Sequence, residues 1–561
     1  MRKLAWVVST ILLVAGPAVA DDKVTLLTAA RIHTMDVAKP AATAMAYGAD
    51  GRILAVGQTD ELAKRYPGAR RLDVGTANVV PGLIDAHGHV GLLGFAKMRA
   101  DLVGTRNKGE VVQRLRDFAR DLPPGAWLLG RGWDQNDWPE QQFPIAADLD
   151  AAFPDRPVWL RRVDGHAAWA NTAALRALKR DLSGNWQPEG GQILRDAQAR
   201  PTGVFVDAAM DLMDKAMPAT DEASAERALV LGMQAAVAHG LTGVHDAGVS
   251  LEGLRRYQRL ADRGQMPLRI YAMADGNRAA LDALCRDGLY RHPSGRLQMR
   301  AVKLMADGAL GSRGAAMLED YSDEHGNRGL LVMSAQELAD ATAKAKRCGV
   351  QAATHAIGDR GNRLTLDTYA RALGADASGD HRWRVEHAQI LSPGDIPRFA
   401  QLRLIASVQP THATSDMPWA QDRVGSERIV GAYAWRQLRD TGARLALGSD
   451  FPVESVDPRL GLSAAVTRAD GDGKPAGGWF PGEKLTAYEA LRGFTLDAAY
   501  AGFAEAEVGS LQAGKRADFV VLAEDLLAVP EAALKALTVL ATYVDGKRVY
   551  EAGKNASAGT P

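Results

Sequence analysis

The stretch "VVPGLIDAHGHVGLLG", residues 79–94, decides the fold, because three polar residues directly follow an apolar run. Asp85, His87 and His89 stand there at alternate positions. If the run is an extended strand, side chains two residues apart point the same way, so His87 and His89 share one face with Asp85 behind them. Two neighbouring imidazoles suggest a metal site. The alternative interpretation is that both are ordinary core histidines held by hydrogen bonds. Residues elsewhere in the chain are needed to distinguish the two interpretations.

The composition limits the class of protein and of partner. A chain of 561 residues has room for one large catalytic domain and a smaller one. Lys plus Arg equals Asp plus Glu, with 67 of each, so no net field attracts nucleic acid or an anionic membrane. We therefore expect a small-molecule substrate and no nucleic-acid partner.

The N-terminus, "MRKLAWVVSTILLVAGPAVADD", has the pattern of a secretory signal peptide. Two basic residues precede an apolar stretch, and Ala18-Val19-Ala20 stands before Asp21, so residues 1–20 are expected to be removed after Ala20. The apolar stretch is shorter than the roughly 20 residues that span a bilayer. We expect a periplasmic or secreted protein with no stable membrane association after cleavage.

The chain has two cysteines, Cys285 and Cys348, each in a segment that is predicted to be helical. Export makes a disulfide chemically possible, but a single pair in a chain of this size is more often two buried thiols. The sequence leaves open whether they pair.

Eight apolar runs alternate with stretches of helical periodicity and predict an α/β fold, a (β/α)8 TIM-type barrel. The runs are "NVVPGLIDAH", "GLTGVHDAG", "PLRIYAMAD", "MRAVKLMADG", "GVQAATHAIGD", "HRWRVEHAQ", "LRLIASVQPTH" and "ARLALGSDFPV". An open doubly wound sheet would favour a Gly-rich phosphate loop after its first strand, and the sequence has none there.

Both ends of the chain are rich in short strands and turns. We expect residues 21–78 and 509–561 to form two parts of one small β-sandwich domain, the latter including a C-terminal tail. The barrel would then span residues 79–508. The interval of about 102–217 fits no single β/α unit and is predicted to be an insertion over the mouth of the barrel.

Histidines and acids gather at the C-terminal ends of the strand candidates, where barrel enzymes place their active sites. These residues are His87, His89, Lys303, Asp307, His355, His387 and Asp450. A single H-x-H motif is weak, but nitrogen and oxygen ligands from several strand ends favour a metal centre.

Lys303 and Asp450 each allow two interpretations. Lys303 lies in an apolar strand, where an unpaired ammonium is costly to bury, so it either pairs with Asp307 or becomes a carbamate that bridges two metals. Alternation places Asp450 on one face with the small residues Ala446 and Gly448, which leaves room for ligands. Asp450 could instead cap the segment that follows.

The chain resembles the metal-dependent amidohydrolase superfamily, and within it the amidohydrolase family 3, YtcJ-like group that includes N-substituted formamide deformylases. The resemblance covers nearly the whole mature chain. Its motifs are "PGLIDAHGHV", "GWDQNDWP", "DGHAAWAN", "KLMADGALGSR", "THAIGDRGN", "VEHAQ", "GSDFPVE" and "GSLQAGKRADFVVL", in this order.

The resemblance implies a complete ligand set: His87 and His89 for a more buried metal, a carboxylated Lys303 as bridge, His355 and His387 for a second metal, and Asp450 as both ligand and general base. Ligands without thiolates suit zinc, so two zinc ions per chain are expected, although some relatives use one metal. Such a pair generates a metal-bound hydroxide that cleaves a C–N bond, in an amide, N-formyl or N-acyl group.

The family motifs also suggest residues that line the substrate pocket: His166, Asp307, Arg313, Trp133 and Asp134. His166 is equally well a hydrogen-bonded loop histidine. The alternative for Trp133, Trp138 and Trp169 is that they fill the core of the insertion, which is the commoner fate of an aromatic side chain. His245 and His412 are interpreted as pocket residues at strand ends. Asp207 stands where relatives more often have Glu, which makes a role for that position doubtful.

Two other functions are considered. The same site could hydrolyse an ester, a lactone or a cyclic amide, because the scaffold does not choose the bond. A non-catalytic binding protein that has lost its metals is expected to lack one or more ligands, and here every ligand is present. Many relatives are dimers, so a homodimer is possible.

Overall fold

The structure is a computed structural model that describes residues 23–162, 167–178, 180–188, 191–207, 209–218, 220–276, 278–311 and 313–554. It divides into two compact units. Unit 1 comprises Met1–His89 together with Met233–Pro561, as far as these are described, and unit 2 comprises Val90–Gly232. The expected signal peptide lies outside the described residues.

Unit 1 contains the expected barrel, as a nearly closed run of eight parallel strands. The eight apolar runs of the sequence each supply one of them. In chain order they are β6 (Leu83–Gly88), β13 (Leu241–Val249), β14 (Arg269–Ala274), β16 (Leu297–Met305), β17 (Gln351–Ala356), β18 (Arg384–His387), β19 (Ile405–Val408) and β20 (Arg444–Leu447). A two-residue strand, β15 (Tyr290–Arg291), pairs antiparallel with β16.

The opening stretch is divided between two sheets. β5 (Asn78–Pro81) joins a second sheet of unit 1, whereas β6 begins the barrel at Leu83. Gly82 stands between them, and a Cβ there would lie 2.1 Å from Thr242 Oγ1. The chain therefore changes sheets at the one residue type that allows this close approach.

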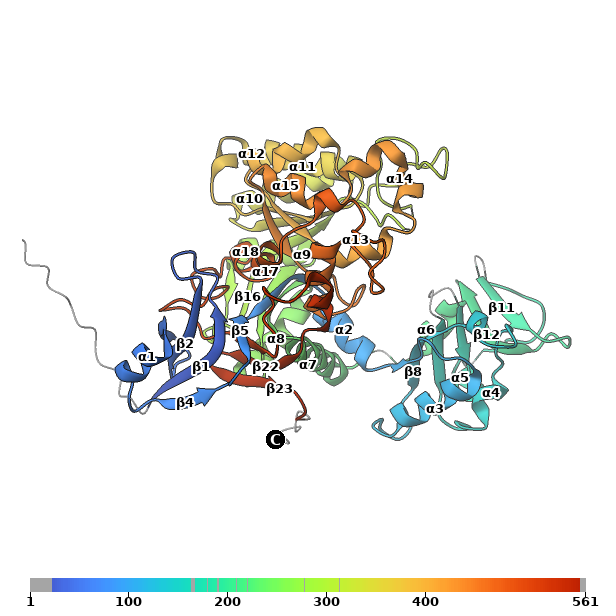
Figure 1. The fold of residues 1–561 in the computed structure, drawn as a ribbon. Coiled ribbons are helices and arrows are strands. Elements are labelled where there is room, and N and C mark those ends of the chain that lie inside the picture. The colour runs from blue at the N-terminus through green and yellow to red at the C-terminus, as the bar shows by residue number, and fades with distance from the viewer. Residues whose placement is uncertain are drawn as a thin grey trace, which may run out of the picture. The chain divides into compact units, whose positions relative to one another are not determined.

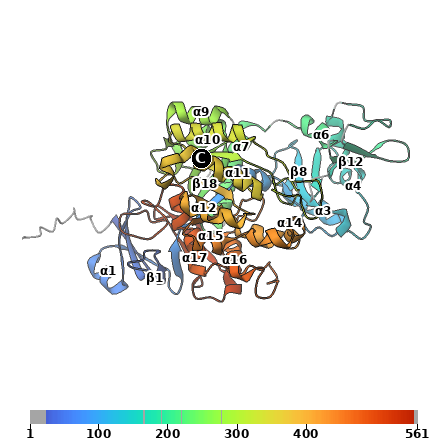
Figure 2. The ribbon, with the colours of Figure 1, turned by 90° about the horizontal axis from the view of Figure 1, so that it is seen from above.

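Helices cover the outside of the barrel, and α10, α11, α12 and α15 lie close together in two views of the ribbon (Figures 1 and 2). No helix among the described residues is long and apolar enough to cross a membrane. The helices of four or more residues from Glu222 onward are α7 (Glu222–Ala238), which precedes β13, and then α8 (Leu251–Asp262), α9 (Arg278–Asp287), α10 (Ala335–Arg347), α11 (Asp359–Leu373), α12 (Ile396–Gln401), α13 (Pro410–Asp416), α14 (Ala420–Arg428), α15 (Trp435–Asp440), α16 (Pro458–Thr467), α17 (Ala487–Gly493) and α18 (Leu496–Ala501).

The two ends of the chain build the other sheet of unit 1 together. Its strands are β1 (Val24–His33), β2 (Ala41–Gly48), β3 (Ile53–Gly57), β4 (Arg70–Asp73), β5, β21 (Phe519–Leu522), β22 (Val539–Val544) and β23 (Lys547–Glu551). β5 pairs antiparallel with β21, which joins the N-terminal and C-terminal halves into one eight-stranded sheet. Leu27, Val79 and Phe519 share its apolar core. The domain is thus discontinuous in sequence, and its description as a sandwich stays a prediction.

Unit 2 contains the expected insertion and has a mixed six-stranded sheet of its own. Its core includes Trp133, Trp138 and Trp169, whose ring centroids lie 5.9–6.3 Å apart. Its strands are β7 (Ala100–Asp101), β8 (Leu128–Trp133), β9 (Val158–Arg162), β10 (Ala167–Ala170), β11 (Gly191–Arg195) and β12 (Pro201–Asp207), and its helices include α2 (Val90–Lys97), α3 (Lys108–Ala119), α4 (Ala147–Asp150), α5 (Thr172–Ala177) and α6 (Met210–Ala216). Because it has its own sheet and apolar core, the insertion is a folded unit rather than a long loop.

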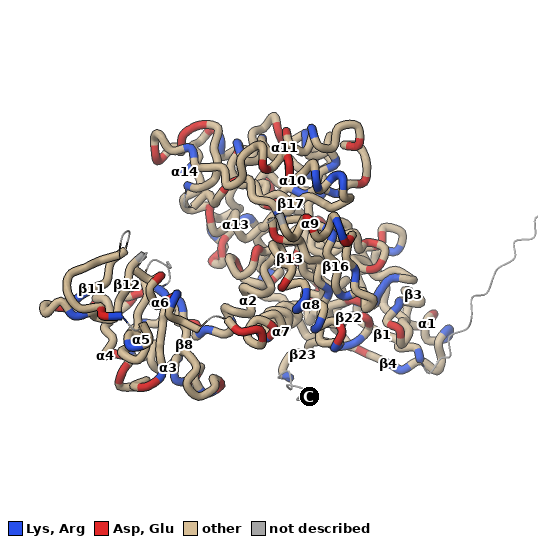
Figure 3. The backbone as a smooth tube through the Cα atoms, turned by 180° about the vertical axis from the view of Figure 1, so that it is seen from behind, with Lys and Arg blue, Asp and Glu red and all other residues tan. Residues whose placement is uncertain are grey.

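Basic and acidic residues are interspersed along the backbone of both units (Figure 3). This agrees with the equal numbers of basic and acidic residues in the sequence.

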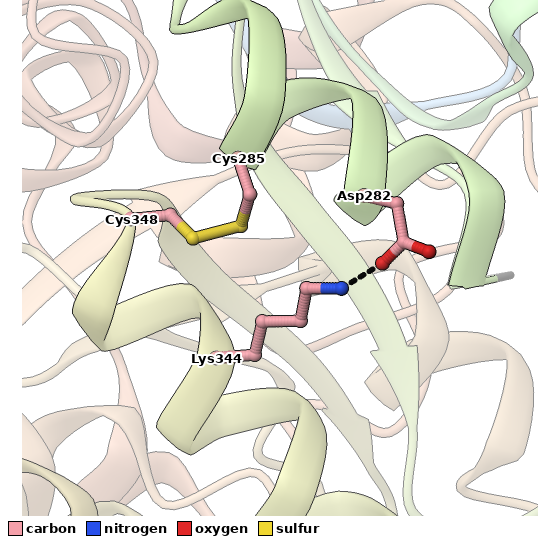
Figure 4. Close-up of a disulfide and its surroundings, with 4 residues drawn as sticks. All are labelled: Asp282, Cys285, Lys344 and Cys348. Atoms are coloured by element: carbon pink, nitrogen blue, oxygen red, sulfur yellow. Dashed lines mark ion pairs between the residues drawn. A yellow bond between two sulfur atoms is a disulfide. The ribbon is translucent and has the colours of Figure 1, made fainter.

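The two cysteines form a disulfide, so the interpretation as two buried thiols is wrong (Figure 4). Cys285 on α9 and Cys348 at the C-terminal end of α10 have Cα atoms 5.0 Å apart. An ion pair between Lys344 and Asp282 joins the same two helices. The pairing depends on two helices that pack together although 63 residues separate the cysteines in sequence.

Removal of this disulfide is expected to destabilise unit 1. In the chain-entropy model, closing a loop of 63 residues contributes roughly 4 kcal/mol to the free energy of unfolding. We expect the C285A/C348A variant to unfold at a lower urea concentration than the oxidised wild type. Adding a reductant should lower the wild-type midpoint and leave that of the variant unchanged; equal midpoints for both proteins without reductant would contradict the prediction.

Candidate metal centre

The six predicted ligands all lie at the C-terminal ends of barrel strands or directly after them. His87 is on β6 and His89 follows it, Lys303 is on β16, His355 on β17 and His387 on β18, and Asp450 follows β20. All except His89 are buried, with exposed fractions of 0–8%. Because these strands are parallel, their carboxyl ends meet at one rim of the barrel.

Nitrogen and oxygen atoms of three of these residues lie close together, and His89 contacts the same group. The ligand atoms of His87, His387 and Asp450 all lie within 4.8 Å of one another. Asp450 Oδ1 lies 3.0 Å from His89 Nε2 and 3.6 Å from His87 Nε2. The H-x-H motif is therefore part of a cluster, and its two imidazoles face the same carboxylate.

Both imidazoles of the motif are held by their Nδ1 atoms. His87 Nδ1 lies 2.6 Å from Glu386 Oε2, and His89 Nδ1 lies 2.9 Å from the carbonyl oxygen of Ala247. An ionised carboxylate and a carbonyl only accept, so each Nδ1 donates its proton. The Nε2 atoms face Asp450, and in a neutral imidazole each would offer its lone pair to a metal bound there, which is how proteins orient histidines that bind metals.

Lys303 lies inside the same cluster. Its Nζ is 2.9 Å from His87 Nε2, and burial lowers the pKa of its ammonium group to about 8. Asp307, the alternative partner, instead accepts backbone N–H groups of Ala316, Ile357 and Gly358 at 2.8–2.9 Å. The side chain of Lys303 therefore points at the histidines.

The other two histidines lie side by side. The ring centroids of His355 and His387 are 4.5 Å apart, and His387 is 4.9 Å from His87. Burial lowers the pKa of His87 to about 4, that of His355 to about 3, and that of His387 well below its usual value. All three imidazoles are neutral at pH 7, the form that binds a metal.

Asp450 is the acid of the cluster. Burial alone would raise the pKa of its carboxyl group, but the neighbouring groups, with the contact to His89 the strongest among them, together lower the pKa below its ordinary value. Its Oδ2 lies 3.8 Å from His412 Nε2 on α13. Asp450 is thus ionised, with one oxygen toward the H-x-H motif and the other toward His412.

This donor set fits a divalent metal. Among the described residues, His387 Nδ1 and His412 Nε2 are buried without a hydrogen-bond partner, although buried polar atoms are nearly always satisfied. Imidazole nitrogens and a carboxylate oxygen are ligands that zinc, manganese and iron accept. A metal bound at this site would be a partner for these buried nitrogen atoms.

Asp85 holds the rim together from behind the cluster. Its carboxylate accepts the backbone N–H groups of His87 and Ser449 at 3.0 and 3.1 Å, and the hydroxyl of Ser449 at 2.6 Å. Burial raises the pKa of Asp85 to about 7, against the lowering effect of these donors. Gly448 lies so close to this junction that a Cβ would be 2.5 Å from His87 N.

The predicted substrate-binding residues lie in different surroundings. Asp307 is fully buried and joins the loop after β16 to the start of α11 through its three backbone donors. Arg313 forms ion pairs with Asp323 and Glu324, at 2.9 and 3.3 Å. His166 lies outside the described residues. A substrate-binding role for any of them stays a prediction.

Trp133 and Asp134 both belong to unit 2. Trp133 has no exposed surface there, and its indole N–H donates to the carbonyl of Leu160 at 2.8 Å. Asp134 accepts from Arg162 at 2.5 Å. The environment of Trp133 matches the alternative interpretation, in which the tryptophans fill the core of the insertion.

Two residues missed by sequence reasoning support the cluster from inside the barrel. Glu386 accepts from His87, and Arg384 Nη2 donates to Glu386 Oε2 at 2.9 Å. Both are fully buried on β18. The signal was present in "RWRVEH", where Arg384 and Glu386 alternate with Val385 in an apolar run.

His245 and His412 need a correction, because neither lies at a strand end. His245 is in the middle of β13, with its ring 4.9 Å from Tyr271, and His412 is on α13. The ring of His412 stacks on His387 at a centroid distance of 5.8 Å.

A solved structure is similar in fold and in sequence over nearly the whole chain. It is described as an uncharacterized metal-dependent hydrolase from Pyrococcus horikoshii OT3, and the two are 27% identical with a TM-score of 0.73. The match covers 91% of this chain and 99% of the other. Together with the ligand cluster, it places the chain in the class of hydrolases with a candidate metal centre at the rim of a barrel.

The chain belongs to the amidohydrolase family, whose model matches residues 73–550. The putative amidohydrolase YtcJ of Bacillus subtilis (strain 168) is 33% identical, over 91% of this chain and 96% of that protein. The N-substituted formamide deformylase of Arthrobacter pascens is 32% identical, over 93% and 97%. Protein LONG AFTER FAR-RED 3 of Arabidopsis thaliana is 35% identical, over 98% and 95%. The resemblance seen in the sequence motifs is confirmed.

Replacing Gly448 with alanine is expected to destabilise the rim. The new Cβ would lie 2.5 Å from His87 N and 2.7 Å from Asp85 Oδ1, so one of these buried groups must move. We expect G448A to lower the free energy of unfolding by about 1–3 kcal/mol, as overpacking does. G471A is the control, because a Cβ at Gly471 meets nothing within 4 Å. Equal urea midpoints for the two variants would contradict this account of the rim.

Proposed function

We propose that the chain is an exported metal-dependent amidohydrolase that cleaves a C–N bond of a small molecule, in an amide, N-formyl or N-acyl group. The observation that carries the proposal is the convergence of His87, His387 and Asp450 within 4.8 Å at the barrel rim. Lys303 and His89 contact the same cluster. In the proposal Lys303 is carboxylated and the site holds two zinc ions.

Divalent metals bound there would supply Lewis-acid activation of water and of the substrate carbonyl. His87 and His89 present their Nε2 lone pairs because Glu386 and the carbonyl of Ala247 hold their Nδ1 protons. Lys303 would act as a bridging ligand, with its Nζ already beside His87 Nε2.

Asp450 would be the proton carrier. Its Oδ1 faces the H-x-H motif, whereas Oδ2 is directed toward His412 at 3.8 Å. As an ionised carboxylate it would accept a proton from the attacking water and deliver it to the departing nitrogen. General acid–base transfer of this kind contributes about 10²–10⁴ in rate.

Two comparisons support cleavage of a C–N bond. The family model is that of amidohydrolases, and one relative similar over most of its length is an N-substituted formamide deformylase. The alternative is the same site acting on an ester, a lactone or a cyclic amide, because a scaffold alone does not fix the bond.

Export forms part of the proposal. The basic, apolar and small-residue pattern of residues 1–20 supports it. The Cys285–Cys348 disulfide supports it independently, because disulfides persist in oxidising compartments and are rare in the cytosol.

Metal analysis of the purified mature protein tests the proposal first. We expect about two zinc, manganese or iron ions per chain, and about one in K303A, since the bridging ligand is removed. Short carboxylic acids should restore part of the metal content of K303A. A normal metal content in K303A without added carboxylic acid would contradict a bridging role of Lys303. If the wild type binds no metal after loading, the result would favour the alternative of a non-catalytic binding protein.

The base is tested by D450N, assayed on the best-hydrolysed member of a panel of N-formyl and N-acyl amines. We expect kcat to fall by at least about 10²-fold, because an amide cannot take up the proton. D457N is the matched control. The side chain of Asp457 is 11% exposed, against 10% for Asp450, but Asp457 caps α16 and pairs with Arg459. D457N should lose stability and keep its turnover. Normal turnover in D450N would refute the proposed role, and hydrolysis of esters but of no amide in the panel would favour the alternative.

A further inference from the structure

Four buried side chains form a continuous hydrogen-bonded chain across the inside of the barrel. His87 Nδ1 donates to Glu386 at 2.6 Å, Arg384 donates to Glu386 at 2.9 Å, and Arg384 Nη1 donates to His245 Nδ1 at 2.7 Å. Their exposed fractions are 0–3%. β18 is hydrogen-bonded to neither β6 nor β13, so these contacts cross the barrel interior.

Arg384 is the centre of this chain and contacts four barrel strands. Besides Glu386 on its own strand and His245 on β13, it donates to the carbonyl of Ala86 on β6 at 2.6 Å and to Ser407 Oγ on β19 at 2.7 Å. Its Nε also forms an ion pair with Glu386 Oε1 at 2.8 Å, although neither of these two atoms makes a hydrogen bond. Every one of these contacts has a group that can accept, and the planar guanidinium reaches them from one fixed position.

The buried carboxylate of Glu386 needs partners on both of its oxygens. An isolated carboxylate is costly to bury, and one without a partner would turn toward any donor or cation within reach. In the proposed function such cations are the metals, which would bind on the Nε2 side of the same His87 imidazole. Arg384 holds both oxygens of Glu386, which keeps Oε2 against His87 Nδ1.

We propose that Arg384 is a positioning residue for the metal centre: it fixes Glu386, and through Glu386 the orientation and tautomer of the His87 imidazole, so that Nε2 faces the metal. The inference rests on the proposed metal-dependent function. Arg384 itself touches neither metal nor substrate. Partners that orient a ligating histidine typically contribute about ten- to a hundred-fold in metal affinity.

The test compares two buried arginines in the same segment of the chain. Arg382, two residues before Arg384, is 8% exposed and is paired with Glu505 at 2.8 Å, but it contacts Tyr500 and Phe503 instead of the cluster. The variants are R384K and, as its matched control, R382K. Lysine keeps the charge at both sites and loses the planar fork.

The measurement is the zinc affinity of each full-length mature variant, by competition with a chromophoric chelator, at a temperature where its metal-free form is folded. We expect R384K to bind zinc at least about ten-fold more weakly than wild type and R382K to bind within about two-fold of it. Thermal unfolding of the metal-free proteins measures how far each variant is destabilised. A purely structural role of Arg384 would lower the unfolding temperature of R384K without changing its zinc affinity.

A second pair of variants covers the case in which R384K does not fold. E386D keeps the charge balance with Arg384 but withdraws the acceptor from His87 Nδ1, and E505D shortens the partner of Arg382 in the same way. E386D should weaken zinc binding by a similar factor, and E505D should not.

Wild-type affinity in folded R384K or E386D would overturn the inference. An equal loss in R382K and E505D would also overturn it, because the effect would then be general destabilisation. If the wild type binds no metal, the proposed function fails first and the inference fails with it; if the wild type binds zinc and only the comparison fails, the proposed function is untouched.

Discussion

The carboxylate of Asp85 joins the two ends of the barrel sheet beside the candidate metal centre. β6 and β20 are the two ends of the barrel sheet, and no ladder joins them. Asp85 on β6 instead accepts the backbone N–H and the hydroxyl of Ser449, the residue before Asp450. It also accepts from the backbone of His87, so one buried side chain fixes the first and the last ligands relative to each other. Backbone hydrogen bonds from Asp450 N to His87 O and from His89 N to Phe451 O complete the junction.

Two predicted ligands, His387 at the end of β18 and Asp450 after β20, have left-handed backbone conformations. His387 and Asp450 have φ values of 72° and 63°, and Ala388 has 44°. Such left-handed conformations cost of order 1–3 kcal/mol for residues other than glycine, and they persist where the surroundings hold them. Here the hydrogen bonds around Asp85 hold Asp450. At each position the left-handed conformation turns the chain, so that the side chain points into the rim. A strand in regular geometry would continue past the rim.

The sequence predicts the barrel well because each strand is an apolar run and stretches of helical periodicity separate the runs. It also predicts the rim residues, since parallel strands bring their carboxyl ends together whatever lies between them in sequence. It cannot show which side chains meet across the interior. The contact of Arg384 with His245 depends on the closed curvature of the sheet. The Cys285–Cys348 bond likewise depends on the packing of α9 against α10, and periodicity says nothing about that pairing. Gly82, where the opening stretch passes from one sheet to the other, could not be identified as a boundary without Thr242 beside it.

The polar interior of the barrel explains one further feature of its composition. Bulky branched residues usually fill such barrels in layers. In this chain the small side chains of Ala247, Ala301 and Ala353 belong to a cluster with Tyr271 and Met273. These small residues leave the volume that the long side chains of Arg384, Glu386 and Lys303 require. Residues on the opposite face of the same strands, such as Val302, Leu304 and Val385, are fully apolar and buried. The apolar side chains between the strands and the surrounding helices therefore contribute most to the stability of the barrel. The interior contains the polar groups that position the histidines.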